Sequence, residues 1–221
     1  QLATAAIRHA SRFIGLREVR ANADWDNPAT PGPDKELADE LRALMRPSPW
    51  KEGWAYCAAA CEGWVLAALR SLNASPNQIK RWQDAMTPHC VTSARNFRRL
   101  GLLSPAPVPG AVWLAQHGSS SNGHAGLVTS VRGVSMATIE ANTSLDKTSP
   151  EKDREGDWIT TRMGLVKGRA PLNTLGFISL SISMSLRAAL WVISSTSAAV
   201  VSELLQSINA LDRALMTPLA R

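Results

Sequence analysis

The order of the hydrophobic patterns along the chain limits its fold more than any other feature. In the front half, apolar residues recur at helical spacing, whereas from Pro105 onward short β-type runs alternate with loops rich in Ser, Gly, Asn and Asp. Helices first and strands afterwards, without alternation of the two, predict an α+β fold with an antiparallel sheet. The 221 residues, of which 45% are hydrophobic, are enough to bury a substantial core.

Four helices are expected in the front half of the chain. Their predicted ranges are residues 2–15, 34–47, 57–72 and 76–86. Asp34 is a candidate N-cap for the second helix, and Ser75 to Gln78 form a capping box for the fourth. The third helix is the most apolar, since only Glu62 and Arg70 are charged, and we therefore expect it to be central and buried.

Five strands are expected in the second half. Their predicted ranges are about 111–116, 124–131, 136–142, 157–163 and 174–179. The second and third are expected to pair as an antiparallel hairpin around Arg132-Gly133.

A further change of composition after Phe177 divides the chain into a main domain, residues 1–179, and an extension, residues 180–221. The extension is rich in Ser, Leu, Ala and Val and has few charges, so we expect a helix or helical hairpin that docks on the main domain or self-associates with another copy. Its uncharged stretch, residues 188–202, is shorter than the ~20 apolar residues that a membrane span needs. Stable membrane insertion is therefore not expected.

The net charge and the N-terminal segment limit the possible functions only weakly. The net charge of +6 and the pI near 9.7 favour anionic partners or simply aid solubility. No nucleic-acid partner is expected, because dense Lys/Arg runs and nucleic-acid-binding signatures are absent from the sequence. Basic residues interrupt the apolar pattern of residues 1–16, so no signal peptide is visible, although a leader removed before Gln1 stays open.

The residues with the clearest chemical potential are a cysteine, a histidine and two polar strand residues. Cys57 is expected at the start of the apolar helix, where unpaired N–H groups and the helix dipole lower a thiol pKa. His124 begins a predicted strand, and Glu140 and Asn142 lie two apart on the next strand, so the hairpin brings His124 opposite them. These residues form the minimum set for thiol-dependent acyl transfer and predict a cysteine amidase or peptidase.

Less specific interpretations of the same residues stay open. A helical cysteine is commonly a small buried hydrophobic residue, Glu140 could face solvent from an edge strand, and Asn142 could begin a turn. The three cysteines, Cys57, Cys61 and Cys90, have no regular spacing and predict at least one free thiol rather than a disulfide framework. No zinc-ligand pattern is present, and we expect neither a metal nor a cofactor.

Several short motifs together resemble one family. They are Trp54-Ala55-Tyr56-Cys57-Ala58-Ala59, Pro109-Gly110-Ala111-Val112, Gly123-His124-Ala125-Gly126-Leu127-Val128, Ile139-Glu140-Ala141-Asn142-Thr143-Ser144, and Arg154-Glu155-Gly156-Asp157 with Thr161-Arg162. The chain resembles the CHAP family, the cysteine- and histidine-dependent amidohydrolases and peptidases, over roughly residues 3–179. It departs from the family at Ala111, where Asp is usual, at Ala141, where Gly is frequent, and at Cys61, where a bulky apolar residue is common.

This resemblance implies a papain-like domain with N-terminal helices packed on a central antiparallel sheet. It implies Cys57 as nucleophile, His124 as general base and then acid, and Glu140 or Asn142 as the group that orients the imidazole. Trp50, Trp54 and Tyr56 are candidates for substrate binding; core or loop-anchor roles for the two Trp side chains stay open. Calcium occurs in some relatives, but the available aspartates, Asp24, Asp26 and Asp34, lack a suitable spacing.

The implied activity is hydrolysis of amide bonds in bacterial peptidoglycan, either as an N-acetylmuramoyl-L-alanine amidase or as an endopeptidase, in the manner of a phage endolysin or another bacteriolytic enzyme. Such a protein acts outside the cell or in the periplasm after delivery by lysis, a virion or a secretion apparatus. Two alternatives use the same fold. One is a non-catalytic wall-binding or virion structural module, and the other is transfer of the acyl group to a nucleophile other than water.

Overall fold

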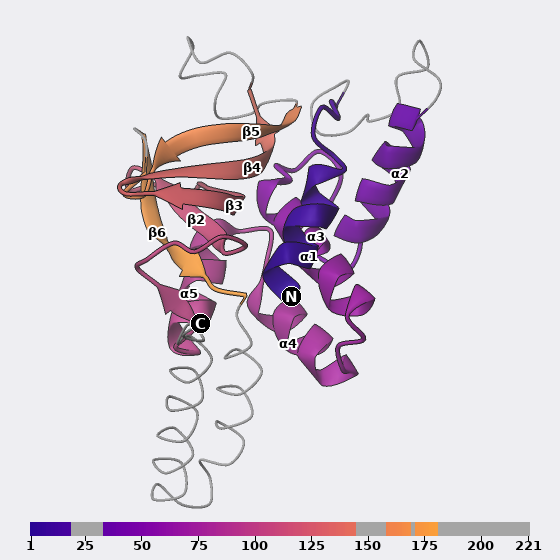
Figure 1. The fold of residues 1–221 in the computed structure, drawn as a ribbon, viewed down its shortest axis with the longest axis horizontal. Coiled ribbons are helices and arrows are strands. Elements are labelled where there is room, and N and C mark those ends of the chain that lie inside the picture. Colours follow the sequence, from indigo (N-terminus) through magenta and orange to yellow (C-terminus); the bar gives the residue numbers. More distant parts are fainter. Residues whose placement is uncertain (19–32, 145–157, 169–170, 181–221) are drawn as a thin grey trace, which may run out of the picture. The chain divides into compact units, whose positions relative to one another are not determined.

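The structure, a computed structural model, describes residues 1–18, 33–144, 158–168 and 171–180 (Figure 1). Within these residues the chain forms five helices followed by six strands. The helices are α1 (Leu2–Ser11), α2 (Pro33–Met45), α3 (Cys57–Ser71), α4 (Pro76–Ala85) and α5 (Cys90–Arg99). The strands are β1 (Leu103–Ser104), β2 (Val112–His117), β3 (Gly123–Arg132), β4 (Ser135–Thr143), β5 (Trp158–Leu165) and β6 (Leu172–Ile178).

The strands form one open antiparallel sheet with the order β1-β6-β2-β3-β4-β5. Helices α1 to α4 gather on one side of it in Figure 1, and α3 packs directly on β3 and β4. The predicted α+β class, with N-terminal helices on an antiparallel sheet, is confirmed. The compact unit ends at Ser181, and the expected helical extension lies outside the described residues.

Helix α3 is the central helix of this arrangement. It contacts α1, α2 and α4 as well as the sheet, and most of its residues are buried, as its apolar sequence predicts. Gly63 allows this packing, because a Cβ atom there would lie 2.9 Å from both the Cβ and the carbonyl oxygen of Leu44. The first residue of the helix, Cys57, is thereby held at the boundary between the helices and the sheet.

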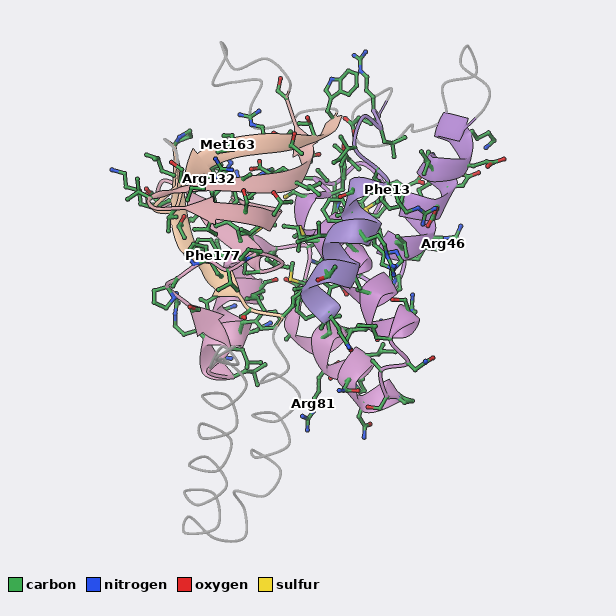
Figure 2. All side chains as sticks on the ribbon, in the orientation of Figure 1. Phe13, Arg46, Arg81, Arg132, Met163 and Phe177 are labelled. Atoms are coloured by element: carbon green, nitrogen blue, oxygen red, sulfur yellow. The ribbon has the colours of Figure 1, made fainter. Side chains whose placement is uncertain are left out.

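Side chains from both layers fill the core (Figure 2). Phe13, just after α1, and Phe177, on β6, are fully buried. Met163, on the edge strand β5, is 63% exposed, as a side chain on the solvent face of a sheet can be. Among the described residues, no helix combines the length and apolarity that crossing a membrane requires.

Most element predictions agree with the structure, and four need correction. The capping box of α4 is present, with the Ser75 oxygen accepting from the Gln78 N–H. Helix α1 ends at Ser11, four residues early, and is followed by turns up to Gly15, whose φ is 95°. Helix α2 begins at Pro33, so Asp34 lies inside it and is not its N-cap.

The other two corrections are elements to which the sequence prediction gave no range, although Arg95, Arg98 and Arg99 were expected on a solvated helix face. Helix α5 was not anticipated because its N-cap is His89, whose ring accepts from the Thr92 N–H, and histidine is an uncommon cap. Strand β1 has two residues and pairs only with β6, so it is too short to give a periodic signal.

Candidate active site

The hairpin of β3 and β4 sets the positions of the histidine and the glutamate. Arg132 pairs with Ser135 across a tight turn in which Gly133 has a φ of 57°, and Gly126 pairs with Glu140 further along. The predicted hairpin is confirmed. His124 lies two residues before Gly126 on the same face of β3. The Glu140 side chain, which is opposite Gly126, therefore reaches His124 diagonally across the two strands.

His124 is held by contacts on two sides. Its Nε2 is hydrogen-bonded to Glu140 Oε2 at 2.8 Å, and both side chains are almost fully buried. The Trp113 ring lies edge-on to the imidazole, with ring centroids 6.1 Å apart, and its Nε1 donates to Thr174 Oγ1 at 2.9 Å. These contacts fix the plane of the imidazole and leave Nδ1 as the nitrogen available to another partner.

Glu140 is completely buried on β4. Its Oε1 accepts a hydrogen bond of 2.6 Å from the Thr138 hydroxyl, while its Oε2 bonds the histidine. Gly126 makes this position possible, because a Cβ there would lie 2.8 Å from Glu140 Cγ. The carboxylate therefore reaches the imidazole across a space that only a glycine leaves open.

Cys57 lies at the start of α3 and interacts with the imidazole. The pKa of Cys57 is held well below its usual value by a hydrogen bond from Cys90, by the charge and hydrogen bond of His124, and by the Ala125 N–H, although burial acts in the opposite direction. No side chain caps α3, whose N-cap is Tyr56. The first-turn N–H groups are thus free of a competing side chain and add to the stabilisation of negative charge.

The pKa of His124 shifts in the opposite direction. Burial alone would lower the pKa of His124, but the charge and hydrogen bond of Cys57, together with the hydrogen bond and charge of Glu140, raise it to about 9. A lowered thiol pKa beside a raised imidazole pKa favours a thiolate–imidazolium pair over the neutral thiol and imidazole. The structure therefore brings Cys57, His124 and Glu140 together in the order that thiol-dependent acyl transfer requires.

Asn142 is buried on β4, two residues after Glu140, but its Oδ1 forms no hydrogen bond with His124. The pairing of β4 with β5 shifts between Glu140 and Thr143, and Asn142 has a φ of 56°. Simple alternation from Glu140 to Asn142 therefore does not hold. Its Oδ1 is buried without a hydrogen-bond partner, so of the two predicted orienting residues Glu140 is the one that contacts the imidazole.

The three aromatic candidates differ in exposure. Trp54 is 51% exposed, with Lys51 Nζ 5.8 Å from its ring centroid, and Trp50 is half-buried, with its Nε1 donating to the Trp54 carbonyl at 2.9 Å. Tyr56 is completely buried and contributes to the core. Trp54 is the candidate whose ring is open to a ligand.

The sequence interpretation missed three residues that contact the site, namely Cys90, Trp113 and Thr138. Thr138 could have been identified by its position two residues before Glu140, on the same face of the strand. Cys90 and Trp113 carry no such signal, because α5 and β2 approach the site only through the tertiary fold. No group of three or more His, Cys, Asp or Glu side chains in the described part of the chain is arranged to hold a metal ion. Asp24 and Asp26 lie outside the described residues.

Comparison of the chain with family models, curated proteins and solved structures finds no match.

Proposed function

We propose that this chain is a cysteine-dependent hydrolase of amide bonds in bacterial peptidoglycan, either an amidase or an endopeptidase of the CHAP type with a papain-like fold. The observation that carries the proposal is the series of contacts from Cys57 through His124 to Glu140. A buried carboxylate beside a histidine, and a histidine beside a thiol at a helix N-terminus, activate sulfur for nucleophilic attack.

The proposed reaction follows from these positions. The Cys57 thiolate attacks the carbonyl carbon, and backbone N–H groups in the first turn of α3 stabilise the oxyanion that forms. The His124 imidazolium protonates the leaving amine, which breaks the C–N bond and leaves an acyl-enzyme. Neutral His124 then takes a proton from water, which hydrolyses the thioester and restores the thiolate, while Glu140 keeps the ring oriented.

The substrate class is supported by the resemblance of the motifs around these residues and by two features of the surface. Trp54 presents an exposed ring beside Lys51, three residues before the nucleophile, where it could contact a sugar or peptide. The net charge of +6 favours association with the anionic polymers of a cell envelope. On this proposal the protein acts on the wall, outside the cytoplasmic membrane.

A second candidate function is a non-catalytic wall-binding or virion module with the same fold. The observation that favours it is burial, since Cys57 is only 3% exposed and His124 only 4%. In such a module, the three residues would be a buried polar cluster that fixes the packing of α3 on the sheet.

Clearing of purified peptidoglycan by wild type and matched variants tests the proposal. We expect Cys57→Ala to abolish clearing and Glu140→Gln to reduce the rate roughly 10²–10⁴-fold, because the imidazole loses its charged partner. Cys61→Ala, one turn further along the same helix, is the control and should retain most of the rate. Mass analysis of the released fragments identifies the cleaved bond.

Two results would redirect the interpretation. Sedimentation of wild type and Cys57→Ala with the wall to the same extent, without any fragments released by wild type, would overturn the hydrolase proposal in favour of the binding module. Fragments joined to an added amine instead of ending in a carboxylate would indicate acyl transfer.

A further inference from the structure

The hydroxyl of Thr138 binds the second carboxylate oxygen of Glu140. Thr138 lies two residues before Glu140 on β4, on the same face of the strand, and both side chains are buried. The backbone of Thr138 is fixed from both sides, because this residue pairs with Val128 on β3 and with Arg162 on β5. The hydroxyl is therefore presented to the carboxylate by the interior of the sheet and not by a loop.

The Thr138 hydroxyl has two acceptors near it and only one proton. Glu140 Oε1 lies 2.6 Å from Thr138 Oγ1, whereas the Arg162 carbonyl oxygen lies 3.4 Å from it. A distance of 2.6 Å is typical of a hydroxyl that donates to an ionised carboxylate, and 3.4 Å is longer than an effective O–H···O bond. The proton therefore points to Glu140.

The two oxygens of the Glu140 carboxylate are thus held by different residues. Oε1 accepts from Thr138, and Oε2 is bonded to His124 Nε2 at 2.8 Å. Rotation about the last bond of a glutamate side chain has a broad energy profile, so the backbone alone does not set the plane of the carboxylate. Thr138 can set it, because a β-branched side chain has few χ1 rotamers and its Oγ1 stays in place.

We propose that Thr138 is a positioning residue that acts through Glu140: its hydroxyl fixes the plane of the carboxylate, so that Oε2 holds His124 in the orientation for proton transfer. The inference deepens the proposed function and rests on it, since it assigns a further residue to the same reaction. A threonine that only filled the core could be replaced by a residue of equal volume without any effect on the imidazole.

The titration of His124 reports this role without any substrate. Burial lowers the pKa of His124, whereas the charge and hydrogen bond of Cys57 and the hydrogen bond and charge of Glu140 raise it to about 9. A carboxylate that rotates freely bonds the imidazolium less well, so loss of the Thr138 hydroxyl should lower the titration midpoint of His124. A purely structural role would leave that midpoint unchanged.

Three substitutions separate the hydroxyl from the volume of the side chain. Thr138→Ser keeps the oxygen, Thr138→Ala differs from Thr138→Ser by that oxygen alone, and Thr138→Val keeps the shape of threonine without the hydroxyl. NMR titration of the full chain labelled at histidine should place the His124 midpoint of Thr138→Ala and Thr138→Val about one pH unit or more below that of wild type. Thr138→Ser should stay close to wild type, and so should the control Thr129→Val, the same change at a half-buried position on β3.

Wall clearing measures the consequence for turnover. We expect kcat to fall roughly tenfold in Thr138→Ala with KM unchanged, a smaller loss than in Glu140→Gln because the charge of the carboxylate remains. The decline of turnover at high pH should move to lower pH together with the His124 midpoint. Thr138→Ser should restore most of the rate.

Two results would overturn the proposal. One is a His124 midpoint that is the same in wild type and in every variant, and the other is an equal shift in Thr138→Ser and Thr138→Ala, because the hydroxyl would then not be the cause. If Thr138→Val does not fold, the Ser and Ala variants decide the question. Absence of released fragments with wild type would instead overturn the proposed hydrolase function, while the His124 titration would still test the hydroxyl.

Discussion

At the scale of single residues, two glycines explain the spacing of the histidine motif. Gly123 leaves room for the Cβ of Cys90, and Gly126 leaves room for Cγ of Glu140. His124 lies between them, so the chain carries no side chain at positions 123 and 126, where Cys90 and Glu140 approach. The Gly-His-x-Gly sequence is therefore a packing requirement of this site.

Replacement of Gly126 by alanine is expected to disable the site without unfolding the protein. The new Cβ would lie 2.8 Å from Glu140 Cγ, so the carboxylate must move away from the imidazole. We expect a loss of roughly 10²-fold in the rate of wall clearing and a stability cost of about 1–3 kcal/mol. Clearing assays and chemical denaturation measure the two effects.

Gly133 supplies the control for this substitution. Its φ is 57°, but a Cβ there would have no atom within 4 Å. Gly133→Ala should therefore cost about 1 kcal/mol of backbone strain and leave the clearing rate unchanged. Equal loss of clearing activity in Gly126→Ala and Gly133→Ala would show that crowding of Glu140 is not the cause of the loss.

The reactivity of Cys57 should reveal the ion pair directly. The lowered pKa of Cys57 means that its alkylation should set in at a lower pH than that of an ordinary cysteine, because the thiolate is the reactive form. Removing the imidazole in His124→Ala removes its charge and hydrogen bond, so the Cys57 pKa should rise. Alkylation at pH 7 should slow about tenfold or more.

The pH dependence of turnover differs from that of alkylation. Turnover also needs the imidazolium as proton donor, so it should fall as the pH rises past about 9, the pKa of His124. At low pH, turnover is limited by formation of the Cys57 thiolate. The low-pH and high-pH limits together describe the coupled titration of Cys57 and His124. An alkylation profile of wild type that first rises near the pKa of an ordinary cysteine would contradict the ion pair.

At the scale of elements, the sequence predicted those parts of the fold whose signals are local. The apolar run after Cys57 predicts α3, and the spacing of two β-type runs around Gly133 predicts the β3–β4 hairpin that joins His124 to Glu140. Both signals require only neighbours along the chain. The hairpin therefore joins His124 to Glu140 through local signals, whereas the approach of Cys57 depends on how α3 packs on the sheet.

The remaining features depend on contacts that sequence spacing does not encode. The approach of Cys90 to Gly123 depends on where α5 packs, and α5 has a histidine cap that is not a common start signal. The register shift after Glu140 breaks the alternation on which the prediction for Asn142 depended. Tyr56 adjoins Cys57 in sequence, but the fold buries the Tyr56 side chain completely.

Helix α4 allows a test of local stabilisation away from the site. Its capping box satisfies two backbone N–H groups through Ser75 and Gln78, so Ser75→Ala should cost about 1 kcal/mol. Lys80→Ala removes an ion pair with Asp84 that is 2.7 Å long but exposed, and should cost no more than about 0.5 kcal/mol. Thermal denaturation ranks the two, and the opposite order would contradict the importance of the cap.

At the scale of the whole described unit, the site joins two layers that are built independently. Helix α3 supplies Cys57, the proposed nucleophile, the sheet supplies the histidine and the carboxylate, and α3 packs directly on β3 and β4. Any change in that packing alters the distance between sulfur and imidazole. Stability of the core and integrity of the site are therefore coupled through α3.

Glu62 places a titratable group in the middle of this packing. Its side chain is buried on α3, and neither carboxylate oxygen has a hydrogen bond of good geometry. Burial raises the pKa of Glu62 from 4.5 to about 7, and the neighbouring Ser48 hydroxyl opposes this only in part. The folded state thus favours the protonated carboxyl, whereas the unfolded chain ionises near the ordinary value.

The stability of the protein should therefore fall as the pH rises from about 4.5 to about 7 because of this residue. Below the ordinary pKa the carboxyl is neutral in both states and costs nothing. Above the raised pKa the folded protein must hold a buried charge, at a cost of about 3 kcal/mol. Glu62→Gln removes that charge, so its advantage over wild type should grow across this range and then level off.

Denaturant unfolding at a series of pH values measures this difference, and the comparison of variant with wild type cancels the titration of other groups. Glu36→Gln, at an exposed position on α2, is the matched control for the loss of one glutamate carboxylate from a helix. A constant difference between Glu62→Gln and wild type from pH 4 to 8 would mean that Glu62 ionises normally. In that case α3 would not enclose the carboxylate as tightly as its packing indicates.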